Sequence, residues 1–175
     1  MPNKSDLQWF ATLAHGCGAQ LDSNQCSFEI TRNGQLLRSI FSSHRSAFSI
    51  TVTAPGAGPL PQAMLRWESG LDRFGKRIGV NREVQTGDEL FDEHVYVESG
   101  ASDEVLQKLL GAENFRKGVL LILQSGFRHV LLGPNGMEIS ACGNQARSVT
   151  APRFDEILSV MGLAKAALPS FSPVE

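Results

Sequence analysis

Hydrophobic and polar positions alternate along several short stretches of the chain, a pattern typical of half-buried strands. Such stretches lie at 26–30, 36–41, 47–53, 63–68, 83–85, 95–98, 129–132 and 137–141. Asn33-Gly34 separates the first two, and Asn-Gly is the strongest short signal of a two-residue hairpin. A second hairpin is expected at 133–136. The pattern therefore predicts about seven or eight strands, mostly linked by hairpins.

Apolar residues recur at helical spacing in other parts of the chain. These segments lie at 7–17, 103–110, 113–124 and 151–161, and a shorter helix is expected at 71–78. Ser102 suits an N-cap, Gly126 suits a left-handed C-cap, and Pro152 suits a first helical turn. Three or four helices packed on an antiparallel sheet make an α+β fold.

The chain of 175 residues is long enough for a single compact domain with its own core. A division into lobes 1–62 and 63–175 is the alternative, because a Pro/Gly-rich loop lies at 54–61. The order helix, strand, turn, strand occurs twice, at 7–41 and 113–141. Two related halves would explain this order, although poor side-chain identity favours chance recurrence of a common unit.

Charge and cysteine content narrow the classes of partner. The 16 basic and 18 acidic residues leave a net charge of -2, which gives no general attraction to nucleic acid or an anionic membrane. The three cysteines lack paired spacing and are expected to be thiols in a reducing compartment.

The N-terminus lacks the layout of a signal peptide, and the apolar run 119–123 is far shorter than a membrane helix. We expect a cytoplasmic protein without membrane contact.

An acidic corner follows the turn Thr86-Gly87-Asp88. Asp88, Asp92 and His94 lie close together in the sequence, and such groups hold a divalent cation or act as acid and base. If 92–98 is a strand, Asp92 and His94 share a face, but two ligands are too few for a site. Asp in a Gly-containing turn usually bonds the backbone, so we favour a structural corner with no cofactor.

The thiols form a second candidate, in which His15, Cys17 and Cys26 approach one another. Zinc usually takes four ligands, and no further Cys or His pair completes the set. Cys17 also falls on the apolar stripe of the first helix, where cysteine acts as a small hydrophobe. We favour core packing, while a Cys-His nucleophilic pair with distant partners remains the alternative.

A basic run with interleaved aromatic residues forms the third candidate. It comprises Arg66, Trp67, Arg73, Phe74, Lys76, Arg77 and Arg82. Single-stranded nucleic acid binding uses cations and aromatic faces. Glu68, Asp72 and Glu83 neutralise this run, which favours a surface for protein over one for phosphate.

The leading hypothesis is a non-enzymatic domain that binds another protein or itself as a homodimer. Aromatic and Arg side chains dominate interface energies. The candidate contacts are Arg66, Trp67, Phe74, Arg77 and Tyr96. The runner-up is a metal-dependent or small-molecule enzyme that uses Asp88, Asp92 and His94, and no catalytic motif in the sequence supports it.

Two resemblances rest on particular residues. The segment Thr86-Gly87-Asp88 with Phe91-Asp92, followed by an apolar strand and Leu109-Leu110, resembles a TGD-x-x-FD segment of uncharacterised bacterial proteins. That likeness covers 63–141 at most and implies a bacterial α+β domain without implying a reaction. The N-terminal helix, the strand at 26–30 and the Asn-Gly hairpin are also similar to type III secretion chaperones. The stretch 66–92 departs from the chaperone pattern.

Overall fold

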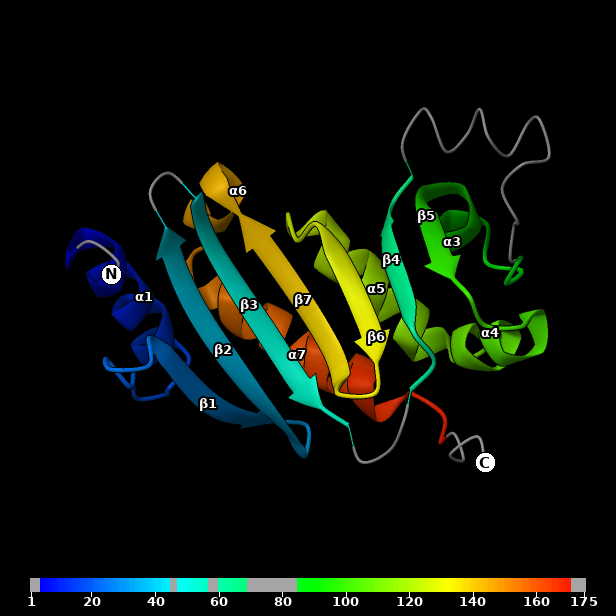
Figure 1. Cartoon of the computed structure of the whole chain (residues 1–175), viewed down its shortest axis with the longest axis horizontal. Helices are drawn as coiled ribbons and strands as arrows, with labels where there is room; N and C mark the ends of the chain where they lie inside the picture. Colours follow the sequence, from blue (N-terminus) through cyan, green and yellow to red (C-terminus); the bar gives the residue numbers. More distant parts are fainter. Residues whose placement is uncertain (1–3, 45–46, 57–59, 69–84, 171–175) are drawn as a thin grey trace.

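A single antiparallel sheet runs through the computed structural model, which describes residues 4–44, 47–56, 60–68 and 85–170. Its seven strands follow the order β1-β2-β3-β7-β6-β4-β5 (Figure 1). The strands are β1 (Ser27–Arg32), β2 (Gln35–His44), β3 (Ala47–Pro55), β4 (Ala63–Trp67), β5 (Val95–Ser99), β6 (His129–Gly133) and β7 (Gly136–Cys142). The predicted α+β fold with a mostly antiparallel sheet is confirmed.

Helices cover one face of this sheet and leave the other open in the described part of the chain. They are α1 (Lys4–Gly16), α3 (Glu89–His94), α4 (Asp103–Leu110), α5 (Glu113–Gln124), α6 (Gly143–Arg147) and α7 (Ala151–Ala166). Figure 1 looks onto the sheet with α5 and α7 behind it, α1 beside β1 and β2, and α3 and α4 beside β5. None of the described helices is long and apolar enough to cross a bilayer.

Local turn chemistry sets the two hairpins as the sequence predicts. Asn33 and Gly34 have φ angles of 51° and 74°, the positive pair that a type I′ turn requires. In the second hairpin Gly136 has φ 114°, and a Cβ there would collide with backbone atoms of β3. Glycine at 136 therefore permits both the turn and the close approach of β3 to β7.

The core lies between the sheet and its helices. Val52, Ile139, Val130 and Leu65 lie side by side across four strands, and each side chain is fully buried. Buried phenylalanines from both layers belong to the same core, and the ring centroids of Phe10 on α1 and Phe41 on β2 are stacked 5.3 Å apart. Alternation along each strand then directs every second residue to the open face.

The segment around the acidic corner differs from the prediction. Residues 92–94 do not begin a strand; they belong to α3, and β5 starts only at Val95. Asp88 is the N-cap of α3, since its carboxylate accepts a hydrogen bond from the backbone N–H of Phe91. Gln85 lies outside any strand, while 83–84 and the predicted helix at 71–78 lie outside the described residues. The short helices α3 and α6 are additional to those expected.

Candidate binding face

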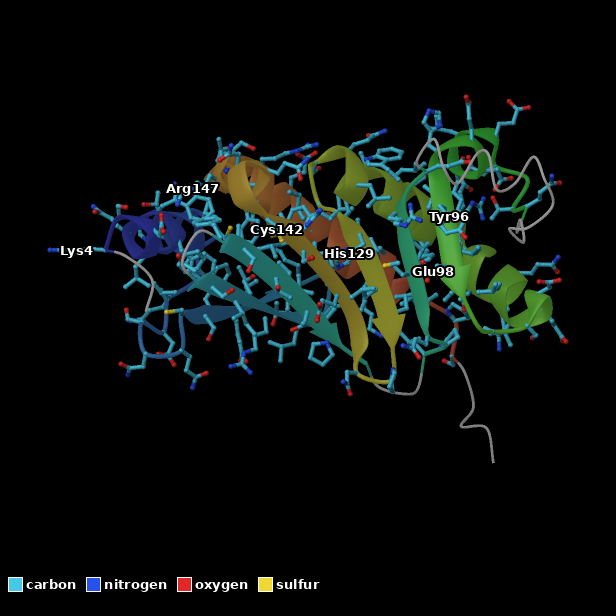
Figure 2. All side chains as sticks on the ribbon, turned by 45° about the horizontal axis from the view of Figure 1, so that its top comes forward. Lys4, Tyr96, Glu98, His129, Cys142 and Arg147 are labelled. Atoms are coloured by element: carbon cyan, nitrogen blue, oxygen red, sulfur yellow. The ribbon has the colours of Figure 1, made fainter. Side chains whose placement is uncertain are left out.

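Two neighbouring rows of side chains cross the open face, one residue from each strand. The Arg66 row consists of Ser27, Ile40, Thr51, Ser140, His129, Arg66 and Tyr96. The Glu98 row consists of Glu29, Arg38, Thr53, Glu138, Leu131, Met64 and Glu98. The first row contains no carboxylate, whereas the second contains three and only one cation. Figure 2 marks Tyr96 and Glu98 on β5 and His129 on β6.

Arg66 and Tyr96 form the best-defined contact on this face. They are direct cross-strand partners on β4 and β5, and the Arg66 guanidinium lies 4.6 Å from the centroid of the Tyr96 ring. The guanidinium also donates a hydrogen bond to the Trp67 carbonyl, with 3.3 Å between Nη1 and the oxygen. The cation–π contact holds a cation and an aromatic ring together as one partly exposed feature.

His129 and Ser140 are the next pair along the same row. The His129 Nε2 and Ser140 Oγ atoms are 3.0 Å apart. Burial lowers the pKa of His129, Glu138 acts to raise it and Arg128 to lower it. A serine nucleophile also needs oxyanion donors, and these two residues lie in paired strands whose backbone N–H groups serve the sheet. The pair therefore adds hydrogen-bonding groups to the Arg66 row.

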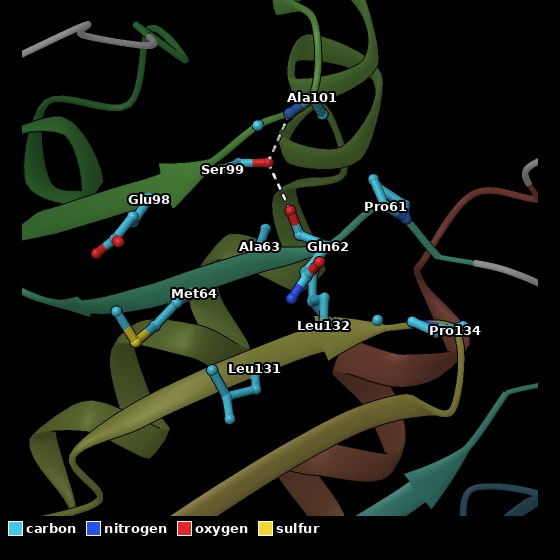
Figure 3. Close-up of a pocket in the computed structure, with 12 residues that line it drawn as sticks. Pro61, Gln62, Ala63, Met64, Glu98, Ser99, Ala101, Leu131, Leu132 and Pro134 are labelled. Atoms are coloured by element: carbon cyan, nitrogen blue, oxygen red, sulfur yellow. Dashed lines mark hydrogen bonds between the residues drawn. The ribbon is translucent and has the colours of Figure 1, made fainter.

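An open hollow of about 950 Å³ continues the face at the ends of β4, β5 and β6 (Figure 3). Met64 and Leu131 form its apolar floor, with Glu98 on the β5 side. Its end is held by Ser99, whose hydroxyl donates to the Gln62 carbonyl at 2.6 Å and accepts from the Ala101 N–H at 3.1 Å. A partly exposed methionine beside a partly exposed leucine suits an apolar contact of variable shape.

No family model, curated protein or solved structure matches this chain. The resemblances to TGD-x-x-FD proteins and to secretion chaperones therefore stay predictions. The open face itself supplies the grounds for assigning a function.

The structure places the five predicted contact residues in different parts of the molecule or leaves them outside the described residues. Arg66 and Tyr96 come together on the open face, as described above. Trp67 follows Arg66 and points to the helix-covered side, where its indole N–H donates to the Leu123 carbonyl at 3.2 Å. Phe74 and Arg77 lie outside the described residues.

Asp88 and Asp92 bind the protein's own atoms. The Thr86 N–H donates to both Asp92 carboxylate oxygens at 3.0 Å, and the Thr86 hydroxyl and Gly87 N–H donate to the same group. Asp88 is also paired with Arg116, with 3.3 Å between Oδ2 and Nε. His94 Nδ1 lies 3.1 Å from the Leu90 carbonyl oxygen. The expectation that these carboxylates bond backbone N–H groups is confirmed.

Neither candidate ligand cluster gathers into a metal site in the part of the chain that the structure describes. There, no three His, Cys, Asp or Glu side chains lie close enough to hold an ion. Cys17 is buried, which raises the pKa of its thiol to about 11, with Asp155 adding to the rise and Arg32 opposing it. The core packing expected for Cys17 is confirmed.

Four residues of this face were missed from the sequence: Met64, Leu131, His129 and Ser140. Alternation in 63–68, 129–132 and 137–141 already assigns them to the polar side of each strand. The missing information was the order of the strands, because β4 pairs with β6, as in Met64 with Leu131, although residues 68–128 separate the two strands in the sequence. Only this long-range pairing brings the four side chains together.

Proposed function

We propose that this chain acts by binding a protein through the open face of its sheet, with Arg66 and Tyr96 as anchors. The observation that carries the proposal is their 4.6 Å cation–π contact beside the apolar floor of Met64 and Leu131. Interface energy concentrates in Tyr, Arg and Trp side chains surrounded by apolar contacts. The arrangement has an anchor, an adjacent apolar surface and a polar rim.

The charges of the face favour protein over nucleic acid. Glu98 and Glu138 lie one row from Arg66 and His129, about 7 Å along the strands. Phosphate binding depends on a patch of cations without such neutralisation. A protein surface with both signs of charge is the better complement.

A secretion chaperone is a second candidate, favoured by the N-terminal unit. The chain has a helix followed by Gly18 with φ 77°, a strand at 27–32 and a type I′ Asn33-Gly34 hairpin, the elements on which the chaperone likeness rests. This candidate makes the partner a secreted protein and keeps the same mode of action. It differs from the general proposal only in the identity of the captured protein.

The test is capture of partners from the native host by tagged full-length protein, with nuclease treatment and mass spectrometry. Arg66→Glu and Tyr96→Ala should lose a stoichiometric partner that wild type retains after nuclease. Arg153→Glu is the matched control, because Arg153 lies on α7 in the helix layer, where it pairs with Glu156. Melting curves must show that all variants are folded. Unchanged capture by folded Arg66→Glu and Tyr96→Ala would contradict the proposal.

A further inference from the structure

We infer that a second copy of this chain occupies the open face, in a symmetric dimer joined sheet to sheet. The inference rests on the proposed function and names its partner. Its basis is the division of charge between the two rows: the Arg66 row has a cation, hydrogen-bond donors and no carboxylate, and the Glu98 row has three carboxylates against the single cation Arg38. When a second copy is turned by a two-fold rotation, the charges of its Glu98 row can therefore complement those of the Arg66 row of the first copy.

The symmetry that uses this complementarity is a two-fold axis lying between the two sheets. If the axis runs across the strands, midway between the rows, each Arg66 row lies over the Glu98 row of the other copy. Strands of the two sheets are then nearly aligned, which is the common geometry of face-to-face sheet packing. A two-fold interface is also the usual way in which identical chains associate.

Register then defines which residues meet. Arg66 lies over Met64 of the second copy, and Glu98 of the second copy is the next residue in that row. His129 lies over Leu131 of the second copy, beside its Glu138. Arg66 and His129 thus each lie near a carboxylate of the second copy, whereas Arg38 lies over Ile40, and Met64 and Leu131 from both copies share the apolar centre.

The size of the face predicts a weak association. Seven strands at their usual spacing span about 30 Å, and two rows with their margins cover roughly 15 Å along the strands. The contact is then roughly 500 Å² per copy, below the ~800 Å² per partner of stable complexes. With charge pairs at its rim, the dimer should form at micromolar concentrations and weaken with added salt.

Sedimentation velocity of the full chain tests this with a charge exchange. Arg66→Glu alone and Glu98→Arg alone each place like charges at neighbouring positions across the interface, so each should weaken the dimer about tenfold or more. In an equal mixture of the two variants, every such pair joins opposite charges again. The mixture should therefore recover dimer, with a species containing both variants.

Runs from about 1 to about 300 µM cover the expected range of dissociation constants. Arg153→Glu on α7 should dimerise like wild type, and melting curves of all variants should stay close to wild type. Wild type that remains monomeric throughout, or a mixture no more dimeric than its components, overturns the second-copy inference. Capture of a host protein by wild type but not by Arg66→Glu would leave the proposed function standing in that case.

Discussion

The two faces of the sheet differ in what their side chains contact, although they alternate along the same strands. On the covered face, Leu65, Val130 and Ile139 are fully buried beneath the helices. On the open face, their sequence neighbours Arg66, His129 and Glu138 remain partly exposed. The two sets share one backbone and one register.

This difference assigns separate tasks to the two faces. Burial of apolar area contributes most of the free energy of folding, so the covered face determines stability. The open face contributes little to stability and is therefore free to carry residues chosen for contact. Substitutions on the two faces should separate into those that unfold the chain and those that change only its binding.

The largest effect is expected from Leu65→Ala. Removing a fully buried leucine loses apolar burial and leaves a cavity, so the free energy of unfolding should fall by about 2 to 5 kcal/mol. Its neighbour Met64, partly exposed on the open face, is the control, and Met64→Ala should cost less than about 1.5 kcal/mol. Urea unfolding of both variants measures the difference. Equal losses would contradict the division between the faces.

A smaller loss is expected at the corner that leads into β5. Asp92→Ala removes the acceptor of the Thr86 and Gly87 donors, so the free energy of unfolding should fall by about 1 to 3 kcal/mol. Exposed Glu93 on the same helix is the control, and Glu93→Ala should change little. Added divalent ions should not raise the melting temperature of wild type if the corner is structural. A stoichiometric metal in the purified protein would refute this interpretation.

Two serines on opposite faces should respond with opposite signs. Ser39 is fully buried on the covered face, and its hydroxyl has no hydrogen-bond partner among the described residues. Ser39→Ala should therefore raise the free energy of unfolding by up to about 1 kcal/mol. Ser140→Ala removes the contact with His129 and should lower it by about 0.5 to 1.5 kcal/mol. Urea unfolding that gives the same sign for both would show that the faces are not distinct here.

The smallest effect concerns pH. Burial lowers the pKa of His129 in the folded state, so the folded chain binds fewer protons than the unfolded chain just below the ordinary pKa of 6.5. The associated stability is complete above pH 6.5 and is lost as the pH falls through the lowered pKa. His129→Gln should remove this part of the pH dependence, measured by urea unfolding between about pH 8 and about pH 5. Parallel curves for wild type and His129→Gln would contradict it.

Most of the secondary structure can be predicted from local sequence signals, such as turn and capping residues. Asn33-Gly34, Ser102 and Gly126 mark a turn, a cap and a helix end, and each occurs as predicted. The error at 92–94 arose because six residues of α3 are too few to show helical periodicity. Its N-cap, Asp88, was interpreted as part of a turn, since both structures use the same side-chain bond to backbone.

The binding face was less predictable than the elements that build it. Residue type alone marks Arg66 and Tyr96 as candidate contacts, and nothing local indicates that they are cross-strand partners. Residue type also marks Trp67 as a candidate, yet strand alternation places its side chain on the opposite face. Which face the helices cover depends on contacts between segments that are distant in the sequence, such as α5 with α7. No short stretch of sequence predicts these contacts.

The central claim is tested most directly by two neighbours on β4, Leu65 and Arg66, measured for both stability and association. The account predicts that Arg66→Glu, which gives up the contact with the Tyr96 ring, lowers the free energy of unfolding by no more than about 1.5 kcal/mol and loses self-association and partner capture. It also predicts that Leu65→Ala unfolds more easily, while the molecules that remain folded still associate. An Arg66→Glu variant that is as destabilised as Leu65→Ala, or that binds as well as wild type, would contradict the account.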